Sequence, residues 1–152
     1  AIDLAEPGDI IVCDAGGDLT NSLMGELMLS HALKRGVSGF VLNGAIRDAE
    51  AFLDINLPVF AAGVSHRGPY KDGPGEINVS VAIDGMVIKP GDLIIGDWDG
   101  VLCVPLNEVD IILKKTEEKQ YAEIKEMKKI KAGQWDRGWV DKILIERGCD
   151  IP

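Results

Sequence analysis

The chain lacks the features that would tie it to a membrane or to nucleic acid. Among its 152 residues, no apolar run is long enough to cross a bilayer, and no signal peptide opens the sequence. The formal net charge is −9, which argues against binding nucleic acid through phosphate contacts. The one lysine-rich stretch, residues 123–131, interleaves lysine with glutamate. We therefore predict a cytoplasmic protein that binds neither a membrane nor nucleic acid.

Cysteines are few and do not pair by spacing. Of Cys13, Cys103 and Cys149, the first two lie in apolar strand patterns, so we expect buried, reduced thiols there. The sequence also has no Gly-x-Ser-x-Gly, no Walker loop, no dinucleotide fingerprint and no Cys-x-x-Cys. These absences leave serine hydrolases, nucleotidases and zinc ribbons without support. An anionic substrate would need a metal ion, an arginine or a helix end to offset the acidic charge.

The first sixty residues alternate between strand and helix patterns, which is typical of a parallel βαβ sheet. A helix capped by Thr20 or Asn21 is expected to end at Gly36. The predicted strands cover residues 10–14, 39–42 and 57–61, and a short helix covers 49–53.

The second half has a different, antiparallel character. A long loop over 64–76 precedes a strand over 77–81, and hairpin turns are expected at Asp84-Gly85 and over 97–100. A long, mostly charged helix over 107–131 has apolar residues at Val109, Ile112, Leu113 and Ile124, and a short helix over 140–146 closes the chain. The long helix either packs at an interface between subunits or is solvated, with one thin apolar stripe. The predicted fold class is α/β, with a parallel first half, antiparallel strands after it and a long C-terminal helix.

Two short stretches could meet to form a polar site. Gly25 and Glu26 open the predicted helix, and Arg47-Asp48 ends the strand that follows it. A helix of about four turns followed by a strand returns the chain to its starting level, so the two stretches can face one another. Free amides at a helix start bind carboxylate or phosphate oxygens, arginine grips a carboxylate, and aspartate is a ligand for Mg²⁺.

Plainer interpretations of these residues remain open. Gly25 could serve only tight packing, and Glu26 could merely complement the helix dipole. Arg47 and Asp48 could form a surface ion pair, or Asp48 could cap the next helix. The adjacent Asn43-Gly44, which would let the backbone approach a ligand closely, favours a site.

These motifs resemble the RraA-like family. The resemblance covers nearly the whole chain and rests on residues 14–17, 25–27, 36–48, 65–69, 90–93 and 97–105. It implies a single swivelling β/β/α domain over residues 1–152, whose N-terminal helical region is missing here. It also implies assembly into trimers or hexamers.

The resemblance implies roles for individual residues. Arg47 would hold a pyruvate carboxylate, Asp48 would bind Mg²⁺ or Mn²⁺, and the amides of Leu27 and Met28, after Gly25, would bind pyruvyl oxygens. Glu26 stands where the best-studied pattern has aspartate, and it would position the water that accepts a substrate proton. On the C-terminal helix, Glu123 would reach the metal's outer shell in a neighbouring subunit.

The implied activity is that of a divalent-metal aldolase. It would cleave a 4-hydroxy-2-oxo dicarboxylic or tricarboxylic acid to pyruvate and a second oxo acid, and would decarboxylate oxaloacetate at the same site. The alternative is a non-catalytic, RraA-type regulator whose partner is a ribonuclease. A methyltransferase is disfavoured because no glycine-rich loop for S-adenosylmethionine is present.

Overall fold

The computed structural model describes residues 1–150, whose contacts divide into two compact units. The first unit covers Ala1–Asn107, and the second begins at Glu108. Every strand in the described part of the chain belongs to the first unit. Each unit is therefore described by itself.

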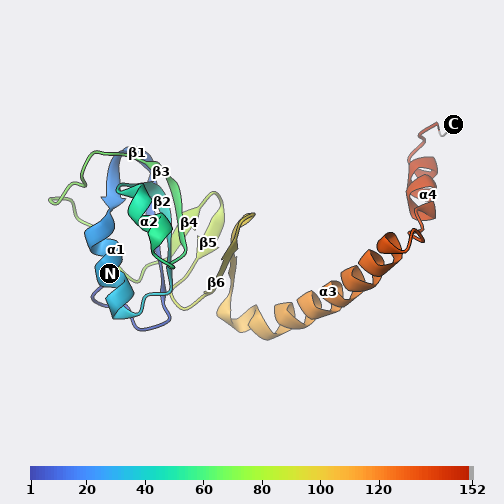
Figure 1. The fold of residues 1–152 in the computed structure, drawn as a ribbon, viewed down its shortest axis with the longest axis horizontal. Coiled ribbons are helices and arrows are strands. Elements are labelled where there is room, and N and C mark those ends of the chain that lie inside the picture. The colour runs from blue at the N-terminus through green and yellow to red at the C-terminus, as the bar shows by residue number, and fades with distance from the viewer. Residues whose placement is uncertain (151–152) are drawn as a thin grey trace. The chain divides into compact units, whose positions relative to one another are not determined.

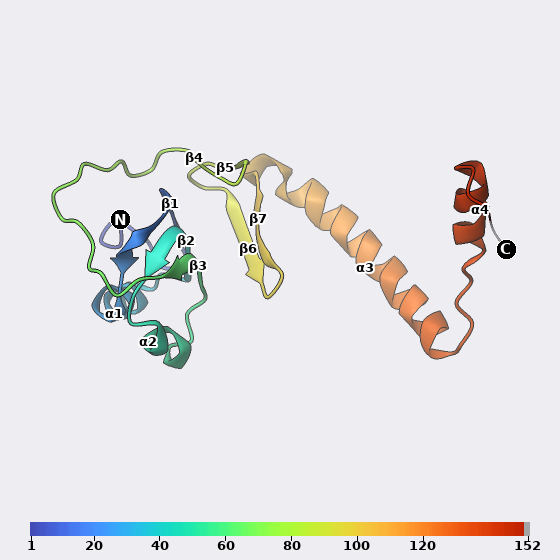
Figure 2. The ribbon, with the colours of Figure 1, turned by 90° about the horizontal axis from the view of Figure 1, so that it is seen from above.

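A three-stranded parallel sheet forms the centre of the first unit (Figure 1). Its strands follow chain order, β1 (Ile10–Met24), β2 (Gly39–Ile46) and β3 (Val59–Val64), with the helices α1 (Glu26–Arg35) and α2 (Ala49–Asp54) between them. The predicted parallel βαβ arrangement is confirmed. Because successive crossovers between parallel strands are right-handed, both helices lie on one face of the sheet, as Figure 2 shows.

The structure confirms Gly25 and Glu26 as the start of α1, whereas the predicted cap at Thr20 or Asn21 was wrong. The helix starts neither after Thr20 nor after Asn21; Gly25, in an extended conformation, is its N-cap, and the helix is ten residues long instead of four turns. The preceding residues continue β1 through three register shifts, and Ser22 and Met24 still pair with β2. Pairing with a neighbouring strand thus overrides the local capping preference.

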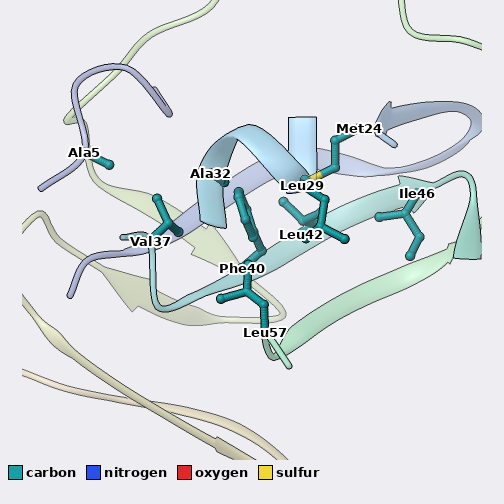
Figure 3. Close-up of a cluster of buried hydrophobic side chains, with 9 residues drawn as sticks. All are labelled: Ala5, Met24, Leu29, Ala32, Val37, Phe40, Leu42, Ile46 and Leu57. Carbon is teal, nitrogen blue, oxygen red and sulfur yellow. The ribbon is translucent and has the colours of Figure 1, made fainter. Parts of the chain in front are cut away.

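The core lies between α1 and the sheet (Figure 3). Leu29 and Ala32 on α1 are fully buried. Alternate residues of β2, Phe40, Leu42 and Ile46, form part of the same cluster, as the two-residue period of a strand requires. This packing fixes the start of α1 relative to the end of β2, where the candidate site lies.

Two antiparallel hairpins follow a long loop. The loop occupies the residues between β3 and β4 (Val81–Ile83), so the strand predicted over 77–81 was wrong in all but its last residue. The turn from β4 to β5 (Met86–Ile88) is confirmed, with positive φ at both Asp84 (47°) and Gly85 (81°). The second hairpin, β6 (Leu93–Asp97) and β7 (Gly100–Val104), is also confirmed.

The cysteines are less buried than predicted. Cys13 and Cys103 are half-buried, and Cys149 is exposed. Partial burial raises the pKa of the Cys13 thiol and, with Asp92 nearby, that of Cys103. Both shifts favour the protonated thiol over the thiolate.

The second unit contains two helices, α3 (Val109–Lys131) and α4 (Gly138–Glu146). The long helix is confirmed, with Ala132 at its C-cap and Gly133 in the left-handed conformation (φ 66°). Met127 and Ile130, which our sequence interpretation omitted, extend the apolar stripe at helical spacing and are exposed. No helix within residues 1–150 is both long enough and apolar enough to cross a membrane.

The packing of α1 predicts a large cost for truncating Leu29. Leu29 is 0% exposed, so Leu29→Ala should lower the free energy of unfolding by roughly 2–5 kcal/mol, through lost burial and the cavity left behind. Leu53, 85% exposed on α2, supplies the matched control, and Leu53→Ala should change stability by less than about 0.5 kcal/mol. Urea denaturation of both variants measures the difference, and equal stabilities would contradict this assignment of the core.

Candidate functional site

The start of α1 and the end of β2 meet in the first unit. The Arg47 amide donates to the Met24 carbonyl at 3.0 Å, which continues the contact between β1 and β2 beyond the last paired residues. Gly25 and Glu26 follow Met24 directly, and Asp48 follows Arg47. The structure thus brings together the two stretches that the sequence placed at one site.

The Asp48 carboxylate joins these two stretches. Asp48 occupies the N-cap position of α2 but makes no capping hydrogen bond there, so the interpretation of its side chain as a helix cap was wrong. Its Oδ2 instead accepts from the Glu26 amide, at 3.1 Å, at the start of α1. This reach coincides with a left-handed backbone at Asp48 (φ 57°, ψ 41°), a conformation that aspartate tolerates better than most residues.

The same oxygen lies beside Arg47. Arg47 Nε is 3.6 Å from Asp48 Oδ2, close enough for charge attraction but beyond hydrogen-bonding distance. Within the described part of the chain, this buried Nε has no hydrogen-bond partner. About two fifths of the Arg47 side chain is exposed, although its Nε is buried.

Two glycines leave room for the Arg47 side chain. A Cβ on Gly25 would collide with Asp48 Oδ2 and lie 2.9 Å from Arg47 Cγ and 3.0 Å from its Nε. A Cβ on Gly68 would lie 3.3 Å from Arg47 Nη1. We call this space between Gly25 and Gly68 the Arg47 slot; the absence of side chains on both glycines creates it.

Amides at the start of α1 face this site. The first amides of a helix have no acceptor within the helix. Asp48 satisfies that of Glu26, whereas those of Leu27 and Met28 have no hydrogen-bond acceptor among the described residues. The side chains of Leu27 (84% exposed) and Met28 (43% exposed) do not belong to the buried core cluster.

The structure gives Asn43-Gly44 a role in packing, not in ligand approach. A Cβ on Gly44 would lie 2.7 Å from Leu23 Cδ1, so the space beside this glycine is filled. Asn43 Nδ2 donates to Asp14 Oδ1 at 2.7 Å. The inference that this pair lets the backbone approach a ligand was therefore wrong.

The carboxylates around the site suit a hydrated divalent cation. An open depression beside the Asp48 carboxylate is lined by four acidic residues, Glu26, Asp48, Glu50 and Asp54. No three histidine, cysteine, aspartate or glutamate side chains within residues 1–150 form a ready-made metal cage. Magnesium often binds through one or two carboxylates and keeps its waters, so this donor set fits Mg²⁺ or Mn²⁺, with Asp48 Oδ1 left for the cation.

Glu123 belongs to the second unit. It lies on α3, is largely exposed, and pairs with Lys119 one turn away. Its contribution to a metal site in a neighbouring subunit stays a prediction.

Sequence reasoning missed the loop segment that closes the Arg47 slot. Ser22 and Asn21 on β1 bind the carbonyls of Arg67 and Gly68. Ser22 and Arg67 are 45 residues apart in the chain, and Asn21 and Gly68 are 47 apart, so no local sequence pattern predicts these contacts. A polar run between apolar residues, Thr20-Asn21-Ser22, was the one signal available.

The chain is similar to several known proteins. The RraA-like family model, described as Aldolase/RraA, matches residues 1–103. A Halalkalibacterium halodurans protein, provisionally named a 4-hydroxy-4-methyl-2-oxoglutarate aldolase, is 44% identical over 116 residues. That match covers 76% of this chain and 55% of the relative, so the chain spans about half the length of that protein.

Solved structures share the fold. An uncharacterized protein from Pseudomonas syringae pv. tomato matches with a TM-score of 0.79 and 27% identity, over 87% of this chain and 66% of that one. The RNA-processing inhibitor RraA from Thermus thermophilis matches with a TM-score of 0.63 and 30% identity, over 66% of this chain and 62% of that one. The family model covers more than half of the sequence, and the chain therefore belongs to the RraA-like family.

Proposed function

We propose that the chain carries the pyruvyl site of a divalent-metal aldolase. The substrate would be a 4-hydroxy-2-oxo dicarboxylic or tricarboxylic acid, cleaved to pyruvate and a second oxo acid. The observation that carries the proposal is Arg47, whose buried Nε has no partner within the described residues and which lies beside unsatisfied helix amides and a carboxylate. The aldolase name of the 44% identical relative supports it.

Arg47 and the helix start would bind the pyruvyl half of the substrate. The Arg47 guanidinium pairs with the C1 carboxylate, and the amides of Leu27 and Met28 donate to pyruvyl oxygens. The backbone donors and the packed arginine are fixed in place before the substrate arrives, so little reorganisation accompanies the reaction. A divalent cation held by Asp48, when bound, supplies Lewis-acid stabilisation of the negative charge that develops on the 2-oxo group.

Cleavage then requires a proton acceptor at C4. Glu26 positions the water that takes the proton of the C4 hydroxyl, and the C4 oxygen becomes a carbonyl oxygen as the C3–C4 bond breaks. The electron pair of that bond passes into the C2–C3 enolate, which is protonated at C3 to give pyruvate. Loss of CO₂ from oxaloacetate leaves the same enolate, so the one site would serve both reactions.

A second candidate is an RraA-type regulator that binds a ribonuclease without catalysis. The Thermus thermophilis protein of the same fold is named as an RNA-processing inhibitor. A net charge of −9 suits a protein that covers a basic, RNA-binding surface. Stable capture of a ribonuclease, without release of pyruvate from any 4-hydroxy-2-oxo acid, would favour this function.

Removing the Arg47 side chain tests the pyruvyl site. We expect Arg47→Ala to lower kcat/KM for pyruvate release from oxaloacetate by at least about 100-fold, as loss of a charge-stabilising donor commonly does. Its circular dichroism spectrum should remain unchanged, because Arg47 Nε makes no hydrogen bond within residues 1–150. Activity within about threefold of the parent chain would contradict the assignment of Arg47 to the pyruvyl site.

Asp48→Asn separates the structural role of Asp48 from its role as a metal ligand. The amide oxygen can still accept from the Glu26 amide, and asparagine is well suited to the left-handed conformation. We therefore expect a melting temperature close to that of the parent chain. Affinity for Mn²⁺, measured by electron paramagnetic resonance, should fall at least about tenfold because the ligand loses its charge. Unchanged Mn²⁺ affinity would remove Asp48 from the metal site.

Gly25→Ala tests whether the missing Cβ is required. The new methyl group would displace the Asp48 carboxylate and the Arg47 side chain together, so oxaloacetate decarboxylation should fall at least about 100-fold, as it does when catalytic groups move by an ångström. Gly73→Ala is the matched control, since nothing lies within 4 Å of its Cβ position. Equal activity of the two variants would show that the close approach at Gly25 has no functional importance.

A further inference from the structure

Ser22 is the most deeply buried polar side chain among residues 1–150, at 1% exposure, and the proposed chemistry does not use it. Its amide and its hydroxyl both donate to the carbonyl oxygen of Arg67, at 2.9 and 2.8 Å. A strand residue usually directs its amide to a neighbouring strand. Ser22 instead donates both hydrogen bonds to one carbonyl oxygen of the long loop.

Neighbouring bonds attach the same loop segment, residues 65–68, at several points. Asn21 Nδ2 donates to the Gly68 carbonyl at 2.6 Å. Ser65 donates from its hydroxyl to the Thr20 carbonyl at 3.0 Å and from its amide to the Ile46 carbonyl at 2.8 Å. The segment is thus held against the ends of β1 and β2, although the rest of the loop up to β4 has no regular structure.

Gly68, which this attachment holds in place, forms one wall of the Arg47 slot. Its Cβ position is 3.3 Å from Arg47 Nη1, and the Gly25 Cβ position on the other side is 3.0 Å from Nε. Arg47 Nε has no hydrogen bond within the described residues. The orientation of the guanidinium therefore depends on packing between two backbone segments, one of which Ser22 secures.

We propose that Ser22 is a positioning residue that fixes the Arg47 guanidinium through the Arg67 carbonyl and the Gly68 wall. Without the Ser22 hydroxyl, one donor to the Arg67 carbonyl is lost, and the loop wall can move away from Nη1. The guanidinium then samples more orientations and presents its paired N–H groups to a carboxylate less often. The effect on substrate rests on the proposed function, whereas the effect on Arg47 does not.

Nitrogen-15 NMR of the arginine Nε–H groups measures how well the Arg47 slot protects the Arg47 Nε–H from water, and it needs no substrate. Arg47→Lys assigns the Arg47 resonance. In the parent chain, burial should make exchange of the Arg47 Nε–H with water slow. Ser22→Ala should accelerate it at least about tenfold, because the proton is protected by local packing that the variant loosens. Ser80→Ala, at an exposed serine with no side-chain hydrogen bond within residues 1–150, should leave the exchange unchanged.

Kinetics on oxaloacetate separates positioning from a general loss of stability. A loosened carboxylate grip weakens ground-state and transition-state binding alike, so Ser22→Ala should raise KM about fivefold or more while kcat stays within twofold. Unfolding of part of the sample would instead lower kcat at constant KM. Gly68→Ala, which presses on Nη1 directly, should also raise KM, and Gly73→Ala should not.

Four outcomes decide the proposal. Faster Nε–H exchange with a raised KM supports it. Faster exchange in Ser22→Ala, in a parent chain that releases no pyruvate, keeps the positioning role and overturns the proposed function instead. Unchanged exchange and unchanged KM in a folded Ser22→Ala chain overturn the positioning role. Should Ser22→Ala fail to fold, Gly68→Ala decides: unchanged exchange and KM in that variant overturn the proposal, and a change in both supports it.

Discussion

The Asp48 carboxylate is the contact on which the candidate site depends. One oxygen accepts the first amide of α1 and attracts Arg47, and it does so from a left-handed residue that leaves its own helix uncapped. A left-handed non-glycine residue costs about 1–3 kcal/mol and persists only where its surroundings enforce it. The surroundings here are the packed start of α1 and the absence of a Cβ on Gly25. The packing of the fold and the candidate site therefore both depend on the contact between Asp48 and the start of α1.

The candidate site has a local positive potential, although the chain as a whole is acidic. An anionic 2-oxo acid would be repelled by a net charge of −9, yet the Arg47 guanidinium and the free amides of α1 offer donors at one point. The four carboxylates lining the adjacent depression attract a cation instead. Together these features fit a substrate that arrives at an arginine and chelates a metal beside it, which is what the two functional groups of pyruvate allow.

Residue types and periodicity were enough to predict much of the fold but only part of the site. The strand pattern over 39–42, the Asp84-Gly85 turn and the long charged helix over 107–131 each carry a local signal, and each prediction was confirmed. Gly25-Glu26 marked the helix start correctly, whereas the capping pattern at Thr20 and Asn21 placed it too early. Ser22 and Met24 pair with β2, a contact that local capping rules cannot anticipate. The contact of the Glu26 stretch with Arg47-Asp48 was predicted correctly, although the predicted helix of about four turns was longer than the ten residues of α1. The Arg47 slot could not be predicted from the sequence, because Ser22 and Arg67, whose contact holds it, are 45 residues apart in the chain.

The most direct test of the central claim is pyruvate release from oxaloacetate by the chain, with Mg²⁺ and then with excess chelator. The account predicts turnover that requires the metal, disappears with chelator and returns when Mg²⁺ is restored, because Asp48 alone cannot stabilise the developing enolate. Turnover that persists unchanged in chelator would contradict a metal-dependent site at Asp48. Absence of turnover under both conditions would contradict the aldolase assignment and favour the regulator.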